Sequence, residues 1–177
     1  MQTGQNVANM YAKRLKTYKH IGFHLSSNGS LSKQTANAIY DSGNYTDVFE
    51  RDIVEAEKTI FVSCPELTWD KVKRFLFLVK TRQEAGCKVT VITKNPQNAL
   101  YGSSEFVREL VKEMQQGGIF VILKDEVSEH FAVLDDELVW HGGMNLLGKE
   151  DAWDNLMRIK SVQVAAELLE IALKKEE

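Results

Sequence analysis

Short apolar runs alternate with amphipathic helical stretches from residue 45 onward, and this alternation constrains the fold more than any other feature. The three runs predicted to form buried strands are residues 59–63, 88–93 and 119–123. Thr46, Thr68 and either Ser103 or Ser104 stand where a helix can begin, each ahead of an apolar stripe at helical spacing. This order predicts an α/β fold: a mixed, mostly parallel sheet with helices on both faces.

A hairpin is predicted after the third run. Residues 131–134 and 138–140 are apolar, and Asp135 and Asp136 between them are common turn formers. Trp140 is expected in the core.

The chain is predicted to hold one packed domain. We place an N-terminal helical extension at residues 1–44 and the domain at residues 45–177, closing with a strand at 155–159 and a helix capped by Ser161. The extension carries a basic amphipathic stretch near residues 7–19.

Polar side chains flank both strands of the hairpin. Ser128 and His130 precede the first strand, and alternate residues of a strand face the same way, so the two should project together. The residues after the second apolar run are His141, Gly142, Gly143, Met144 and Asn145. The paired glycines allow close backbone approach, and the His and Asn side chains supply hydrogen bonds. We therefore expect the functional site here.

The stretch from Ser128 to Asn145 resembles the signature of the phospholipase D superfamily, which reads H-x-K, four residues, Asp, six residues, G-S-x-N. The spacing fits throughout, with Asp135 at the Asp position and Asn145 at the Asn position. Three identities differ, because Ser128, His130 and Gly143 stand at the His, Lys and Ser positions.

The resemblance implies a metal-independent reaction with no cofactor. In that family one His attacks the phosphodiester phosphorus, a second protonates the leaving group, and the Lys and Asn hold phosphate oxygens. Ser128 would need a partner base to act as nucleophile. His130 is displaced by roughly 6–7 Å along the strand, whereas about 1 Å can cost on the order of 100-fold in rate. We expect a degenerate site with His130, Ser128 and Asp135 at the catalytic positions. The expected phosphate-binding residues are Gly142, Gly143, Asn145 and His141.

Two functions remain open. The segment from Trp140 to Leu147 and the DNLMRI that begins at Asp154 look like phospholipase-D-like domains attached to bacterial helicases and nucleases. The preferred function is therefore a catalytically impaired domain that binds a phosphodiester backbone, DNA before lipid, or a helicase or nuclease partner. The alternative is an active phosphodiesterase that works through His130 or His141. Family members with one motif copy pair two copies across a dyad, so a homodimer is expected.

Charged and aromatic residues of the second helix have two interpretations. Lys71 and Arg74 belong to a basic series that is either a solvated helix face or a contact for nucleic-acid backbone. Trp69 suits either packing or ligand contact. The net charge of −3 argues against a coat of nucleic acid over the whole surface.

Nothing in the sequence predicts a membrane or secretory protein. The chain has no apolar run near the 18 residues of a membrane span, and its N-terminus lacks the apolar core of a signal peptide. Cys64 and Cys87 have no metal-site or disulfide spacing. A cytoplasmic location without bound metal is the expectation.

Overall fold

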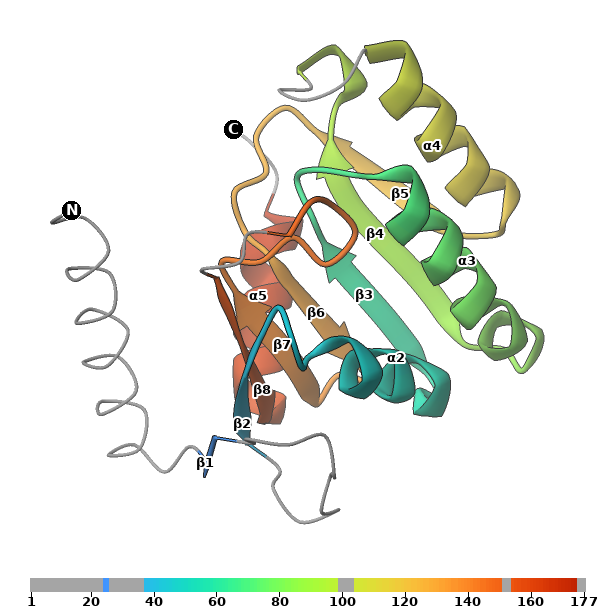
Figure 1. The fold of residues 1–177 in the computed structure, drawn as a ribbon. Coiled ribbons are helices and arrows are strands. Elements are labelled where there is room, and N and C mark those ends of the chain that lie inside the picture. The colour runs from blue at the N-terminus through green and yellow to red at the C-terminus, as the bar shows by residue number, and fades with distance from the viewer. Residues whose placement is uncertain (1–23, 26–36, 99–103, 151–153, 175–177) are drawn as a thin grey trace, which may run out of the picture.

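The structure is a computed structural model, and it describes residues 24–25, 37–98, 104–150 and 154–174. Within them, one eight-stranded sheet has helices against both faces (Figure 1). The strands are β1 His24–Leu25, β2 Ala38–Asp41, β3 Thr59–Ser63, β4 Lys88–Lys94, β5 Phe120–Lys124, β6 Phe131–Leu134, β7 Leu138–Gly142 and β8 Asn155–Lys160. The helices are α2 Thr46–Glu55, α3 Trp69–Glu84, α4 Ser104–Gln116 and α5 Val162–Leu173, and a short 3-10 turn, η1, covers Pro96–Asn98.

The sheet is mixed. Its strand order is β1-β2-β8-β7-β6-β3-β4-β5. The pairs β1–β2, β3–β4 and β4–β5 are parallel, and the other neighbouring strands are antiparallel. The predicted α/β fold with a mixed sheet is therefore confirmed. Its antiparallel part is larger than expected, because β6, β7 and β8 form an antiparallel meander inserted between β2 and β3.

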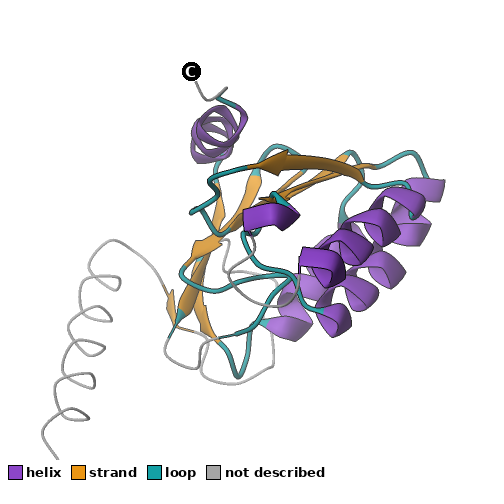
Figure 2. Cartoon of the chain, turned by 90° about the horizontal axis from the view of Figure 1, so that it is seen from above, coloured by secondary structure: helices purple, strands orange, loops and turns teal. Residues whose placement is uncertain are grey.

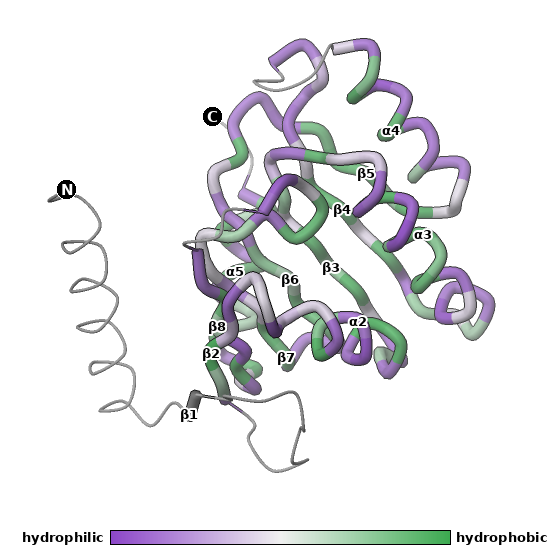
Figure 3. Tube along the Cα trace, in the orientation of Figure 1, coloured by the Kyte–Doolittle hydropathy of each residue, from purple (hydrophilic) through white to green (hydrophobic). Residues whose placement is uncertain are grey.

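Alternating side chains of the strands build two cores, one on each face. Ile60 and Val62 of β3 point into the larger core, beneath α2, α3 and α4. Phe61 points the other way, into a smaller core closed by Ala165 of α5. Among the described helices, Figure 2 shows α5 on one side of the sheet and the layer of α2, α3 and α4 on the other. Apolar residues are concentrated in the central strands, while α4 alternates apolar and polar along its length (Figure 3).

Strand β2 belongs to this sheet, although the sequence placed it in the N-terminal extension. Its residues pair antiparallel with β8, Ala38 opposite Arg158 and Asp41 opposite Asn155. A domain that starts at residue 45 would therefore leave out β2, which is a strand of its sheet. The basic stretch near residues 7–19 lies outside the described residues.

A buried ion pair fastens α2 to the middle of the sheet. Asp52 is only 4% exposed, and its Oδ2 accepts hydrogen bonds from Trp140 Nε1 (2.9 Å) and Arg158 Nε (2.7 Å). Arg158 also donates from Nη2 to Asp52 Oδ1 at 2.9 Å, so the guanidinium binds both carboxylate oxygens. Trp140 is fully buried, so its predicted place in the core is confirmed. The bidentate pairing offsets the cost of burying the charge.

The helix starts are close to those predicted. Ser161 caps α5, and its Oγ accepts from Val164 N–H at 3.2 Å. Thr68 occupies the position before α3 but makes no capping bond with its side chain. Among the described helices, none is long and apolar enough to cross a membrane.

Candidate functional site

Most of the residues expected in the site lie near the edge of the sheet at which β3 and β4 end, and Asp135 is the exception. Ser63, the last residue of β3, pairs with Phe131, the first residue of β6, and Phe131 pairs with His141 near the end of β7. Ligands of open α/β sheets bind at the carboxyl ends of parallel strands. The loop from 143 to 150, which we call the site loop, lies at this edge and carries Asn145.

The imidazole of His130 is held against the site loop. Its Nδ1 lies 2.8 Å from the carbonyl oxygen of Gly143. A carbonyl only accepts, so Nδ1 carries the proton and Nε2 of the neutral ring keeps its lone pair. The ring is therefore fixed in one tautomer, with its basic nitrogen directed away from the bond.

His141 does not share a site with His130. Trp140 lies in the core beneath α2, α3 and α4, and Val139 lies in the core beneath α5, so His141 faces the α5 side by alternation. Its Nε2 is 3.6 Å from Glu129 Oε2. His130, opposite Gly142, faces the other side. The prediction that His141 contacts the same phosphate is corrected: the hairpin register sends the two rings to opposite faces.

Cys64 anchors the site loop beneath Asn145. The Sγ atom of Cys64 lies 2.9 Å from Glu66 O and 3.5 Å from Asn145 Oδ1, and it accepts from Leu147 N–H at 3.4 Å. The thiol has one proton, which goes to the nearer acceptor, Glu66 O. Complete burial raises the pKa of Cys64 to about 12, so the thiol stays protonated at neutral pH. Sequence reasoning missed this role of Cys64 because two of its partners, Asn145 and Leu147, lie 81 and 83 residues away.

The two glycines are explained by packing. An added Cβ at Gly142 would lie 1.9 Å from Asn155 O, and one at Gly143 would lie 2.7 Å from the Asp154 carboxylate. The Gly142 N–H already donates to His130 O at 3.2 Å. Gly142 is thus corrected from a phosphate donor to a residue of the β6–β7 ladder, and Gly143 contributes its carbonyl to His130.

Ser128 lies at the surface just before His130. Among the described residues, no hydrogen bond joins Ser128 to a histidine or carboxylate that could act as its base. The arrangement that activates a serine nucleophile is therefore missing there.

Asp135 lies at the other end of β6 from His130. Five residue steps separate them, or roughly 16–17 Å at about 3.3 Å per residue. The Asp135 carboxylate accepts N–H bonds from Glu57, Lys58 and Thr59 at 2.6–3.1 Å. Burial raises the pKa of this carboxyl, but the three backbone donors outweigh it and leave the pKa below its usual range. Asp135 is corrected from a catalytic to a structural residue.

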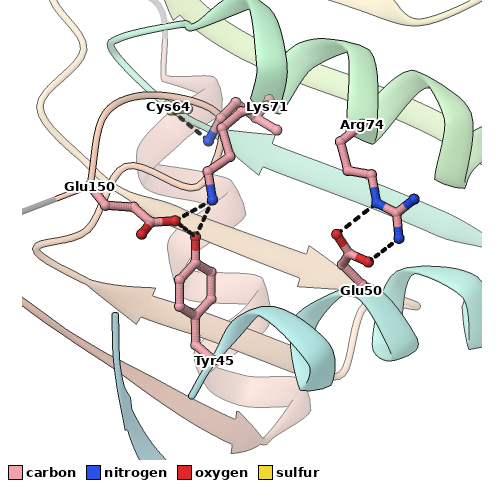
Figure 4. Close-up of polar contacts among 7 residues, drawn as sticks. Tyr45, Glu50, Cys64, Lys71, Arg74 and Glu150 are labelled. Carbon is pink, nitrogen blue, oxygen red and sulfur yellow. Dashed lines mark hydrogen bonds and ion pairs between the residues drawn. The ribbon is translucent and has the colours of Figure 1, made fainter. Parts of the chain in front are cut away.

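Lys71 is occupied by partners within the chain. Its Nζ pairs with Glu150 of the site loop and donates to Tyr45 Oη at 2.8 Å, and that hydroxyl donates to Glu150 at 2.5 Å (Figure 4). Burial lowers the pKa of Lys71, but Glu150 and Tyr45 raise it by more than burial lowers it. The pKa of Lys71 is therefore above its ordinary value. Lys71 therefore ties α3 to the site loop.

Arg74 is paired as well. Its Nε and a terminal nitrogen bind the two oxygens of Glu50 at 2.8 and 2.5 Å (Figure 4). Glu150 therefore opposes the predicted contact of Lys71 with a nucleic-acid backbone, whereas phosphate can still compete with Glu50 for Arg74, whose side chain is 53% exposed. Glu50 and Glu150 could not be matched to them from sequence, because the pairs are 24 and 79 residues apart.

The described residues contain no cluster of three or more histidine, cysteine or acidic side chains arranged to hold a metal ion. What this part of the chain brings together at the carboxyl edge is an imidazole, a carboxamide and backbone groups of the site loop. Such groups can bind an oxyanion through hydrogen bonds.

Comparison with known proteins gives the fold. No family model matches the sequence, and no curated protein is significantly similar to it. Nuc from Salmonella typhimurium, described as a phospholipase D family member, matches with a TM-score of 0.60 and 14% identity, over 76% of this chain and 88% of Nuc. NucT from Helicobacter pylori matches with a TM-score of 0.56 and 14% identity, over 77% of this chain and 92% of NucT.

A third solved structure belongs to a DNA-binding protein. TrmBL2, described as an archaeal chromatin protein with a novel mode of DNA binding, matches with a TM-score of 0.54 and 13% identity. The match covers 95% of this chain but only 60% of TrmBL2. Together with the strand order and the two helical layers, these similarities show that the chain has the phospholipase-D-like fold.

Proposed function

We propose that this chain binds the phosphodiester backbone of DNA at the carboxyl edge of its sheet without cleaving it. The observation that carries the proposal is that the site keeps groups able to bind phosphate but lacks the histidine nucleophile of the motif. His130 contacts the site loop and Asn145 belongs to it, while the His position of the motif holds Ser128, which has no base among the described residues.

The chemistry of this edge suits a phosphate better than a neutral ligand. The Asn145 carboxamide donates to oxygen, and the His130 ring would do so as well once Nε2 takes up a proton. The N-terminus of the 16-residue helix α3 lies at the same edge and carries the positive end of its dipole. The likeness to TrmBL2, described as DNA-binding, supports DNA as the source of the phosphate.

Carboxylates near the edge limit the strength of this binding. Glu150 neutralises Lys71, and Glu129 lies beside His141. We therefore expect binding that depends on a few hydrogen bonds and weakens with salt by a shallow slope, because few counterions are released.

One observation favours the alternative, a metal-independent phosphodiesterase. The bond from His130 Nδ1 to Gly143 O leaves Nε2 as a lone pair, as a nucleophile requires. In this mechanism Nε2 forms a P–N bond while the P–O bond to the leaving group breaks, and the leaving oxygen takes a proton from a general acid. Water then cleaves the P–N bond. In a homodimer, His130 of the second copy would supply that acid.

The homodimer and a helicase or nuclease partner are parts of the same proposal. The chain has a mass of 20.1 kDa, so a dimer doubles this value in light scattering. A monomer mass at micromolar concentration would remove the paired-site mechanism.

The test compares His130→Ala with His141→Ala, which is the matched control on the opposite face. Hydrolysis of bis(p-nitrophenyl) phosphate and of DNA is measured with EDTA present, together with DNA affinity. We expect no hydrolysis by the unmodified chain, and weaker DNA binding in His130→Ala but not in His141→Ala. EDTA-resistant hydrolysis that disappears only in His130→Ala would establish the alternative. DNA affinity that neither His130→Ala nor Asn145→Ala changes would overturn the binding site.

A further inference from the structure

Two large aromatic side chains are exposed on the outer surface of α3. Trp69 is 42% exposed and Phe77 is 71% exposed. They are eight residues apart with Lys73 midway, and residues four apart lie on one face of a helix. Exposure of this kind is unusual for a Phe, since aromatic side chains are normally buried through most of their area.

Each exposed ring has a cation over it. Lys73 Nζ lies 4.4 Å from the centroid of the Trp69 ring, and Arg74 Cζ lies 5.5 Å from that of Phe77. A cation covers one face of an aromatic ring, and the exposed 42% of Trp69 and 71% of Phe77 leave surface of both rings accessible to another planar group. We call Trp69, Lys73, Arg74 and Phe77 the α3 strip.

We infer that the α3 strip binds single-stranded nucleic acid by stacking unpaired bases on Trp69 and Phe77. Two helical turns separate these residues, about 12 Å along the axis, so two different bases are engaged. Sequence-tolerant single-strand sites combine aromatic platforms with cations that follow the backbone. In a duplex the bases are already stacked, so the strip discriminates against double-stranded DNA.

The charge of α3 suits a polyanion. The helix carries two acidic residues, Asp70 and Glu84, against a larger basic set: Lys71, Lys73, Arg74, Lys80 and Arg82. Lys73 pairs with Glu113 and Arg74 with Glu50, but the cationic side chains are 41% and 53% exposed. Exposed ion pairs contribute little, so phosphate oxygens can compete for these cations. A purely apolar docking surface for a protein would not place a cation on each ring.

The strip begins next to the site loop. Thr68, directly before Trp69, donates its N–H to Leu147 O at 2.9 Å. A strand bound at the carboxyl edge can therefore continue along α3. The inference rests on the proposed nucleic-acid function for its ligand class, but it concerns different residues and can fail separately.

The test measures fluorescence anisotropy of labelled oligo(dT) and of a labelled duplex with the full chain. The variants are the double change Trp69→Ala with Phe77→Ala, the stacking-competent Trp69→Phe, and Phe120→Ala as an exposed aromatic control that is 67% exposed on β5. Circular dichroism checks the fold of each. Loss of one stacked base weakens binding on the order of 10-fold. We expect about a 100-fold loss for oligo(dT) in the double variant, little change for the duplex, and near-normal affinity in Trp69→Phe and Phe120→Ala.

Three results would overturn the inference. One is unchanged oligo(dT) affinity in the double variant, and another is an equal loss for the duplex, which would indicate contact with the backbone alone. The third is a change in oligomeric mass without a change in affinity, which would make the strip a protein interface.

Asn145→Ala separates the two proposals. Weakening by Asn145→Ala alone keeps the proposed site and rejects the strip, weakening by the strip variants alone does the reverse, and no binding by the unmodified chain rejects both.

Discussion

Asp135 provides the sharpest test of the structure, because the sequence motif and the structure assign it different roles. If it binds the N–H groups of Glu57, Lys58 and Thr59, removing its carboxylate should lower stability and leave ligand binding intact. The variants are Asp135→Ala and Asp135→Asn. The matched control is Asp136→Asn, whose side chain makes only a 3.3 Å bond to Thr59 Oγ1.

The size of the effect follows from the contacts. A hydrogen bond to a charged group contributes about 1.5–3 kcal/mol. Solvent screens this partly exposed carboxylate, so about 1 kcal/mol for each of three donors is appropriate. Asp135 also has a φ of 52°, a region that costs other residues about 1–2 kcal/mol but that Asn tolerates. We therefore expect losses of about 4 kcal/mol for Asp135→Ala, about 2 for Asp135→Asn, and under about 0.5 for Asp136→Asn.

Urea unfolding measures these losses. With a slope of roughly 2 kcal/mol per molar, the midpoint should fall by about 2 M for Asp135→Ala and about 1 M for Asp135→Asn. The pKa of Asp135 is lowered by folding, so its contribution is complete above its unfolded pKa, near 3.8, and is lost as the pH falls below that value. The difference between Asp135→Asn and the unmodified chain should therefore shrink below about pH 4. An Asp135→Ala chain within 1 kcal/mol of the unmodified one, or one with normal stability and abolished DNA binding, would refute this reasoning.

Other substitutions test other contacts. Asp52→Ala leaves Arg158 and Trp140 without their buried acceptor and should cost about 3–5 kcal/mol in urea unfolding; a loss below 1 kcal/mol would contradict the buried ion pair. Gly142→Ala brings a Cβ within 1.9 Å of Asn155 O and should lower the thermal midpoint by several degrees, whereas Gly86→Ala, with nothing within 4 Å, should show only the smaller cost of its positive φ. Cys64 should resist a thiol reagent at pH 8 until urea unfolds the chain, because its thiol is buried and its pKa is about 12; rapid labelling of Cys64 in the native state would show that the site loop opens.

Local patterns were enough to predict most of the elements. The run at 59–63 matches β3 residue for residue, the turn at Asp135 and Asp136 lies where expected, and both residues have positive φ values. The strand predicted at 119–123 is shifted by one residue, to Phe120–Lys124. Strand β2 was missed because AIYD is too short to show a period.

The candidate site was harder to predict, because spacing along a chain does not give direction in space. Matching the motif placed His130, His141 and Asp135 together. The structure separates His141 by the face of the sheet and Asp135 by the length of β6. Applying strand alternation to both arms of the hairpin would have separated the two histidines, since His141 pairs with Phe131 and not with His130. The carboxylates that occupy Lys71 and Arg74 depend on how α2, α3 and the site loop pack, which no local pattern encodes.

The place of β8 has a consequence for how the protein is made. Strand β2 has one partner near the start of the chain, β1, and on its other side it pairs with β8, as in the register of Ala38 with Arg158. During synthesis, more than a hundred residues must follow β2 before β8 emerges and pairs with the second edge of β2. Contacts between such distant segments slow folding, and an uncovered strand edge invites association with other chains. We expect chains that stop before β8 to aggregate on the ribosome or soon after release, since they lack a strand from the middle of the sheet.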